Sequence, residues 1–594
     1  ITAGTLTGVV SGGTNGSITI TTEAGSLTVN EVVTATGTGD VVLDANGGTS
    51  DVNLNANVTA GDDATIEAGQ DILQASATDY IIADELALLA GRKIGAATGA
   101  TAIDTRVAQI AASFGTATDS DAFINEDSVG TTLAVDVVPN LITAGTLTGV
   151  VSGGTNGSIN ISTEDGTLTV NQVVTATGTG VILLDANTTG STANIAVNAN
   201  IQTANGIIAI TAGDVITINQ TINSSTGNDL TTLIATDLVF GGSGAVTTGS
   251  GGITIKPVGA STLGIGAGTG TFNLIDTDLD KLTTSGLLTI GDANTTTVDI
   301  DTVTNPTGIT GDVAILGNSI VVTALNLTAS GDVGLFADAG SITDGGTTEA
   351  DVTATSVILS ATGSIGASGN SLDLVVTNLA AESSTSGDIF LSDTGGMNIG
   401  SVTVGATNVV GVTTTASDIE ITDTNTININ SPVDADSNGD VTIETTAGTG
   451  NIVLNDDVRS SNAGTGDGSG VITLDANGSI LDGTAGRIEA SAGDVRLIAG
   501  TSVGATGGGR ILTLVGDIAA VASGGGVFIN ESTDFTITTV STSTTLLNGT
   551  STTGITASSG NDIEIVTTAG SITVAENVTT SGAGDVVLDA NGGT

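Results

Sequence analysis

Residues 1–46 read ITAGTLTGVVSGGTNGSITITTEAGSLTVNEVVTATGTGDVVLDAN, and residues 142–187 repeat them as ITAGTLTGVVSGGTNGSINISTEDGTLTVNQVVTATGTGVILLDAN. The two stretches start 141 residues apart and differ at eight of 46 positions. A third relative occupies residues 562–594, and its last eleven residues are identical to residues 39–49. A weaker copy begins near Asp418. Self-similarity at a long, nearly constant spacing is typical of repeat architectures.

A shorter rhythm runs inside each repeat. Segments such as GSITI, GSLTV and GDVVL begin at Gly16, Gly25 and Gly39, at intervals of 9 and 14 residues. Each segment alternates aliphatic residues with Thr or Asn, which indicates a half-buried strand. The Gly and Asn residues between segments indicate tight turns. We therefore predict an all-β fold, an elongated parallel β-solenoid of stacked coils of about 20–23 residues.

A second motif divides the chain into modules. It reads KIGAATGATAIDTRVAQIAA from Lys93, SIGASGNSLDLVVTNLAA from Ser364 and SVGATGGGRILTLVGDIAA from Ser502. A segment with one aromatic residue follows each copy, at Phe123, Phe390 and Phe528, and we expect these rings to fill the core. The predicted modules are residues 1–141, a longer or double module at 142–400, residues 401–550, and the start of a further module at 551–594. We expect the chain to continue beyond both ends.

Composition separates this fold from its alternatives. The 594 residues are 39% hydrophobic with a mean hydropathy of +0.36, which argues against disorder despite a formal charge of −53. An immunoglobulin-like sandwich also has short, regular strands. Aromatic residues make up only 2% of the chain and Pro occurs four times, so a stack of aliphatic ladders fits better. At ~4.8 Å per coil such a stack would be roughly 130 Å long.

Residue counts also exclude several functions. The chain has no His and no Cys, so it cannot form a Ser-His-Asp triad, a Cys nucleophile, a thiolate or imidazole zinc site or a disulfide. Nine basic residues against 62 acidic ones do not suit a nucleic-acid partner. No apolar run reaches the ~18 residues that a membrane-spanning helix needs.

The G-[DS]-[IV] strand starts and the [SK]-[IV]-G-A…A-A…F segments resemble those of filamentous-haemagglutinin-type adhesins and autotransporter passengers of bacteria. The resemblance covers essentially the whole chain. It implies a right-handed parallel β-helix that is secreted and serves in adhesion or as a stalk. The secretion domain that marks this family is not found in these residues.

One loop has the spacing of a metal site. The sequence DADSNGD places oxygen-bearing side chains at alternate positions, which matches the first half of an EF-hand-like calcium loop: Asp434, Asp436, Asn438 and Asp440. The closing Glu of that pattern would fall at residue 445, which is Thr. An exposed acidic turn is the alternative. The four LDAN sequences, from Leu43, Leu184, Leu474 and Leu588, are interpreted as turns and not as calcium ligands.

These observations predict a structural protein and not an enzyme. We expect an extracellular or cell-surface fibre, stalk or adhesin shaft that requires no cofactor, with calcium as the one candidate ion. The alternative is an S-layer or sheath subunit with calcium-assisted lateral packing. The partners expected are further copies, end to end or side by side, and surface or matrix polysaccharide. A polysaccharide-cleaving β-helix is disfavoured because the nine basic residues are scattered, and an ice-binding solenoid because the Thr pairs drift out of register.

Overall fold

A computed structural model of the chain describes residues 8–97, 101–115, 120–127, 130–186, 192–346, 350–385, 387–460, 469–484, 486–542 and 550–591. The chain forms two compact units. The first contains residues 1–261, 271–290 and 308–311, and the second contains residues 262–270, 291–307 and 312–594. Both units are stacks of parallel strands with almost no helix, and together they contain about 23 solenoid turns. The predicted parallel β-solenoid is therefore confirmed.

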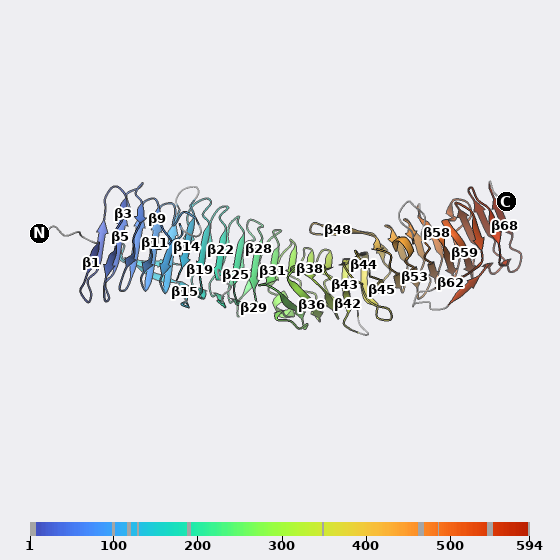
Figure 1. The fold of residues 1–594 in the computed structure, drawn as a ribbon, viewed down its shortest axis with the longest axis horizontal. Helices are drawn as coiled ribbons and strands as arrows, with labels where there is room; N and C mark the ends of the chain where they lie inside the picture. The colour runs from blue at the N-terminus through green and yellow to red at the C-terminus, as the bar shows by residue number, and fades with distance from the viewer. Residues whose placement is uncertain are drawn as a thin grey trace. The chain divides into compact units, whose positions relative to one another are not determined.

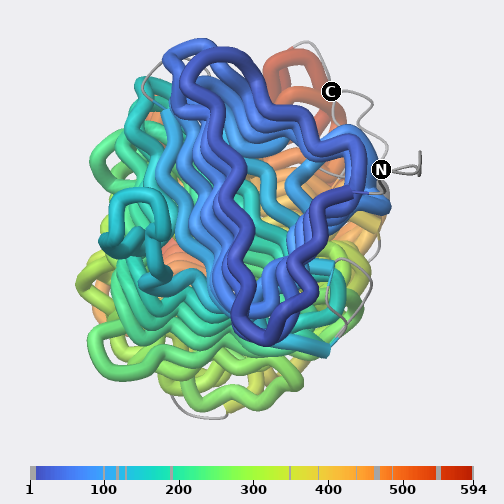
Figure 2. Tube along the Cα trace, turned by 90° about the vertical axis from the view of Figure 1, so that its left-hand side faces the viewer, coloured from blue at the N-terminus to red at the C-terminus, as the bar shows by residue number. Residues whose placement is uncertain are grey.

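Each regular coil carries three short strands. In the first unit, one coil contains β2 (Ile18–Thr21), β3 (Leu27–Val29) and β4 (Val33–Ala35), and the next contains β5 (Val41–Ala45), β6 (Val52–Leu54) and β7 (Val58–Thr59). Every strand pairs in parallel with its counterpart, so that Ile18 faces Val41. Figures 1 and 2 show the blue coils of this unit following one another in this way. Residues paired between parallel strands are 18 to 38 positions apart, because some coils carry an insertion.

The core consists of aliphatic ladders. Strands β19 (Ile159–Thr163), β22 (Ile182–Ala186) and β25 (Ile208–Ala212) place Ile159, Ile182 and Ile208 in register, each fully buried. Their neighbours in sequence point outward, as the alternation predicted. The solenoid thus repeats one inward contact from coil to coil, which explains why similar residues recur at the coil spacing.

The G-[DS] strand starts have two separate functions. The Asp or Ser side chain caps the next coil, since the N–H of Asp418 donates to Oδ1 of Asp388 at 3.1 Å and that of Asp440 to Oδ1 of Asp418 at 2.9 Å. The Gly allows the coils to approach closely. A Cβ at Gly180 would lie 2.2 Å from the carbonyl oxygen of Gly157. The motif is therefore a coil-to-coil joint, and it places many of the chain's acidic residues.

An antiparallel hairpin follows each copy of the second motif. The three hairpins are β16–β17 (Val137–Asn140, Gly145–Thr148), β47–β48 (Ser401–Val404, Thr407–Val410) and β62–β63 (Thr539–Ser541, Ser551–Thr553). Each hairpin packs on the sheet beneath it, where Ala111, Ala380 or Ala519 is fully buried. In the first hairpin Val138 forms a cluster with Ala87 and Ala111. The two adjacent alanines of the motif thus form part of the surface on which the hairpin packs.

This packing predicts the effect of introducing a charged side chain at position 138. Val138→Asp should release the β16–β17 hairpin, because Val138 is fully buried and a carboxylate there would have no partner. The lost burial is worth about 1.5–3 kcal/mol. Hydrogen exchange of residues 137–148 measures the release. Val137→Asp is the matched control, since its side chain is 37% exposed. Equal protection in the two variants would contradict the packing argument.

Candidate functional site

The predicted calcium residues lie at a corner of the second unit. Asp434 ends β52 (Val433–Asp434), residues 436–438 form a 3-10 turn, and Asp440 precedes β53 (Val441–Thr445). Oδ1 of Asp434 accepts the N–H of Asp436 at 3.0 Å, and its Oδ2 lies 3.8 Å from Nη1 of Arg459. Oδ1 of Asp440 accepts the N–H of Val471 at 2.7 Å. These oxygens serve the protein's own turns and coil joints.

Asn438 is also engaged by the protein. Its Oδ1 accepts a hydrogen bond from the hydroxyl of Ser469 at 2.7 Å. Burial raises the pKa of both Asp434 and Asp440, so each carboxylate lies in partly desolvated surroundings. The four residues do not form one of the groups of three acids whose oxygens meet within 4.8 Å in the described part of the chain. Calcium binding by this loop stays a prediction.

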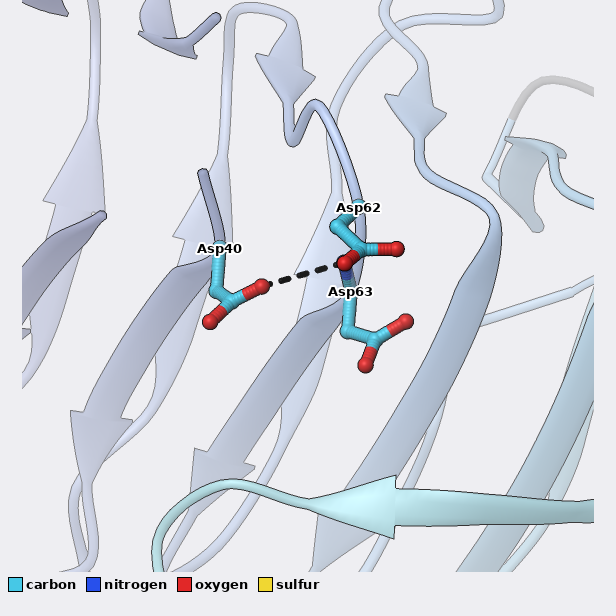
Figure 3. A group of neighbouring side chains, drawn as sticks. All are labelled: Asp40, Asp62 and Asp63. Atoms are coloured by element: carbon cyan, nitrogen blue, oxygen red, sulfur yellow. Dashed lines mark hydrogen bonds between the residues drawn. The ribbon is translucent and has the colours of Figure 1, made fainter. Parts of the chain in front are cut away.

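Such a group of three does occur in the first unit. Figure 3 shows Asp40, Asp62 and Asp63, each partly buried, with carboxylate oxygens within 4.8 Å of one another. They stand where β5 and β8 (Ala64–Ala68) begin, and the N–H of Asp63 donates to Oδ1 of Asp40 at 3.4 Å. Burial, followed by repulsion from Asp62, raises the pKa of Asp63 to about 6. The group is a strand-start ladder with one additional acid, as the sequence GDD at residues 61–63 could have indicated.

A polar network surrounds the single tyrosine. The guanidinium of Arg106 lies 3.8 Å from the ring centre of Tyr80, and its Nη2 donates to Oδ2 of Asp127 at 2.8 Å. The carboxyls of Asp127 and Glu164 are hydrogen-bonded to each other, which raises the pKa of Glu164. Burial alone would raise the pKa of Asp127, but hydrogen bonds from Arg106 and its other neighbours lower it. The pKa values of the two neighbouring carboxyls therefore shift in opposite directions.

A shallow groove of about 500 Å³ lies beside this network. Its lining includes Asp84, Arg106 and Thr131. Arg106, Tyr80 and the two carboxyls could together bind sugar hydroxyls. The pair does not have the geometry of a glycoside hydrolase, because catalytic carboxyls stand about 5–9.5 Å apart and these two are in hydrogen-bond contact.

Three buried acids recur at one place in the modules, and the sequence analysis did not identify them. Glu126, Asp393 and Glu531 each lie three residues after the motif's Phe and are at most 1% exposed. Each carboxylate accepts a backbone N–H from the preceding coil, that of Val107, Val376 or Val515. These acids therefore hydrogen-bond adjacent coils to each other, shortly before the segment that forms the hairpin. The recurring F-x-x-[DE] spacing was the available signal.

The basic residues are largely neutralised by neighbouring acids. Five of the six arginines form ion pairs with Asp or Glu: Arg92, Arg106, Arg459, Arg487 and Arg510. Arg496 is 5% exposed and donates from Nε to the hydroxyl of Thr552 in the third hairpin at 2.9 Å. The arginines therefore brace the solenoid and are not gathered for binding a polyanion. No helix in the described residues is long and apolar enough to cross a membrane.

Comparison with protein-family models, with characterised proteins and with solved structures finds no match to this chain. The structure is compatible with a β-helix repeat protein, as the resemblance to filamentous-haemagglutinin-type adhesins implied.

Proposed function

We propose that the chain is a segment of an extracellular or cell-surface shaft, the structural part of a fibre, stalk or adhesin. The observation that supports this most is the coil-to-coil pairing that runs through the described residues of each unit. In the second unit, β50 (Ile419–Asp423), β53 and β56 (Ile472–Ala476) pair in succession, in register and in parallel. Because backbone hydrogen bonds join successive coils throughout the described strands, bending or stretching a stack strains several ladders together.

The external charge supports the same function. Sixty-two acidic residues against nine basic ones leave a surface that repels its copies at low salt and remains soluble. The strand-start carboxylates account for part of this charge. Asp388, Asp418 and Asp440 each accept a backbone N–H from the next coil and also contribute negative charge to the surface. We propose a passive role without catalysis. Within the described residues, we propose the groove beside Arg106 as the surface that binds a polysaccharide partner.

Electron microscopy of the purified chain tests the proposal. At low salt with a chelator, we expect separate, stiff fibres. Ordered sheets that form only with millimolar calcium would favour the alternative, an S-layer or sheath subunit. Release of sugars from a polysaccharide panel, with no fibres, would contradict a structural function.

A further inference from the structure

Three copies of the second motif place equivalent residues at one coil corner, and the copies differ in charge there. The strand pairing aligns Ile72, Ile342 and Ile480, because each bridges to the first apolar residue of its motif. Two positions further on stand Gln74, Asp344 and Asp482. The same pairing aligns Asp104 with Asp373, and Tyr80 with Asp351. Only the second copy has an acid at all three positions: Asp344, Asp351 and Asp373.

In the first copy the side-chain amide of Gln74 makes the hydrogen bonds at this corner. Nε2 of Gln74 donates to Oδ2 of Asp104 at 2.7 Å and to the carbonyl oxygens of Ser76 and Asp79 at 2.8 Å. Oε1 of Gln74 accepts the N–H of Asp104 at 3.0 Å. A donor group thus sits among three oxygens. In the second copy Asp344 replaces that amide. Its Oδ1 accepts the N–H of Gly346, and Nδ2 of Asn370 donates to its backbone carbonyl oxygen at 3.4 Å, but among the described residues no donor reaches Oδ1 of Asp351.

The consequence is visible at Asp351, which is fully buried. Its Oδ2 accepts the N–H of Asp373 at 2.7 Å, but its Oδ1 has no hydrogen-bond donor. The group within hydrogen-bonding reach of Asp351 is the carboxyl of Asp344, which is another acceptor when ionised. None of the ion pairs in the described part of the chain reaches Asp344, Asp351 or Asp373.

We propose that Asp344 and Asp351 bind a calcium ion at this corner of the second unit. Two facing carboxylates match the charge of a divalent cation, and hard oxygen ligands in flexible surroundings are those that calcium prefers. The ion takes the place that the amide nitrogen of Gln74 occupies in the first copy. Without an ion, burial and then the neighbouring Asp344 carboxyl raise the pKa of Asp351 to about 8. The site is distinct from the loop at Asp434 and from the partly buried group at Asp40.

Calorimetry with the full chain tests this proposal. Calcium chloride is titrated into metal-free protein at pH 8 and about 0.15 M salt, where screening over ~8 Å weakens diffuse binding to the acidic surface. We expect a saturable site that depends on Asp344 and Asp351. Asp344→Gln restores the residue of the first copy and should fold, and Asp351→Asn keeps the shape of the side chain. Because even outer-shell partners are worth about 10–100-fold in metal affinity, each variant should weaken binding by more than about tenfold.

Asp40→Asn is the matched control, because it removes one charge from the partly buried group in the first unit and should leave the saturable site intact. Hydrogen exchange gives a second readout. Calcium should slow exchange in residues 342–344 and 351–354 of the parent, whereas Asp344→Gln should be protected without calcium. The proposal is overturned if the parent has no saturable site, which would mean that protons alone neutralise the pair. It is equally overturned if Asp344→Gln binds calcium as the parent does.

Discussion

Gly180→Ala is expected to loosen the coils on both sides of residue 180. Its Cβ would lie 2.2 Å from the carbonyl oxygen and 2.5 Å from the carbonyl carbon of Gly157 in the preceding coil. Both are backbone atoms, so no side-chain rotation relieves the contact. Gly206, in the following coil, makes the same close approach to Gly180, at 2.0 Å. The methyl group would therefore force apart a ladder of three glycines.

Overpacking of this kind is worth about 1–3 kcal/mol or more. Amide exchange in β19, β22 and β25 measures it, and a loss of 1 kcal/mol corresponds to roughly fivefold faster exchange by local opening. Gly48→Ala is the matched control, because a Cβ at Gly48 has nothing within 4 Å. It should leave exchange unchanged or slightly slower, since Ala reduces the entropy of the unfolded chain. Parent-like exchange in Gly180→Ala would contradict the close-approach argument.

The regular coils could be predicted because their pattern is local. Each strand alternates with period two, and the residues that stack, such as Ile159 and Ile182, recur at the coil spacing. The hairpins could not be predicted. Residues 137–148, VVPNLITAGTLT, alternate much as a stacked strand does, although β16 and β17 pair antiparallel and leave the coil. Alternation reveals a strand but not its partner.

The side chains after each second motif show where local pattern misleads. The core position predicted for the aromatic residues is wrong for Phe123 and Phe528, which are partly exposed. Ala122, Ile124 and Glu126 point inward instead, so the alternation places Phe123 on the outer face. In a chain with 62 acidic residues, the alternation alone does not distinguish an inward-facing Glu126 from a surface residue, and only the recurring F-x-x-[DE] spacing marks it.

Asp423→Thr is expected to make the second unit less sensitive to pH. Asp393 and Asp423 lie in register on neighbouring strands and are each 1% exposed. Burial raises the pKa of Asp423 to about 6, and repulsion from Asp393 adds to the effect. The first and third copies avoid this pairing, because Glu126 stacks on Thr163 and Glu531 on Thr567. The substitution thus introduces the residue that the protein uses at both equivalent positions.

The sign of the pH dependence follows from the direction in which the pKa of Asp423 shifts. Asp423 binds its proton more tightly in the folded chain than in the unfolded one, where the pKa is 3.8. Its contribution to stability is therefore complete below pH 3.8, falls as the pH rises, and is lost above about pH 6. A shift of about two pKa units corresponds to about 3 kcal/mol. The parent should become less stable between pH 4.5 and 7.5, the reverse of ordinary acid unfolding.

Calorimetric unfolding and hydrogen exchange of β45 (Ile389–Asp393) and β50, both across that pH range, measure the effect. The Asp423→Thr variant should lose less stability than the parent and be the more stable of the two at pH 7.5. Asp338→Thr, at an exposed acid in the same unit, should follow the parent's curve. If the curves of the parent and Asp423→Thr run parallel, the stacked pair is not the source of the pH dependence. If they converge at low pH, two buried carboxylates in register set the upper pH limit of this part of the solenoid.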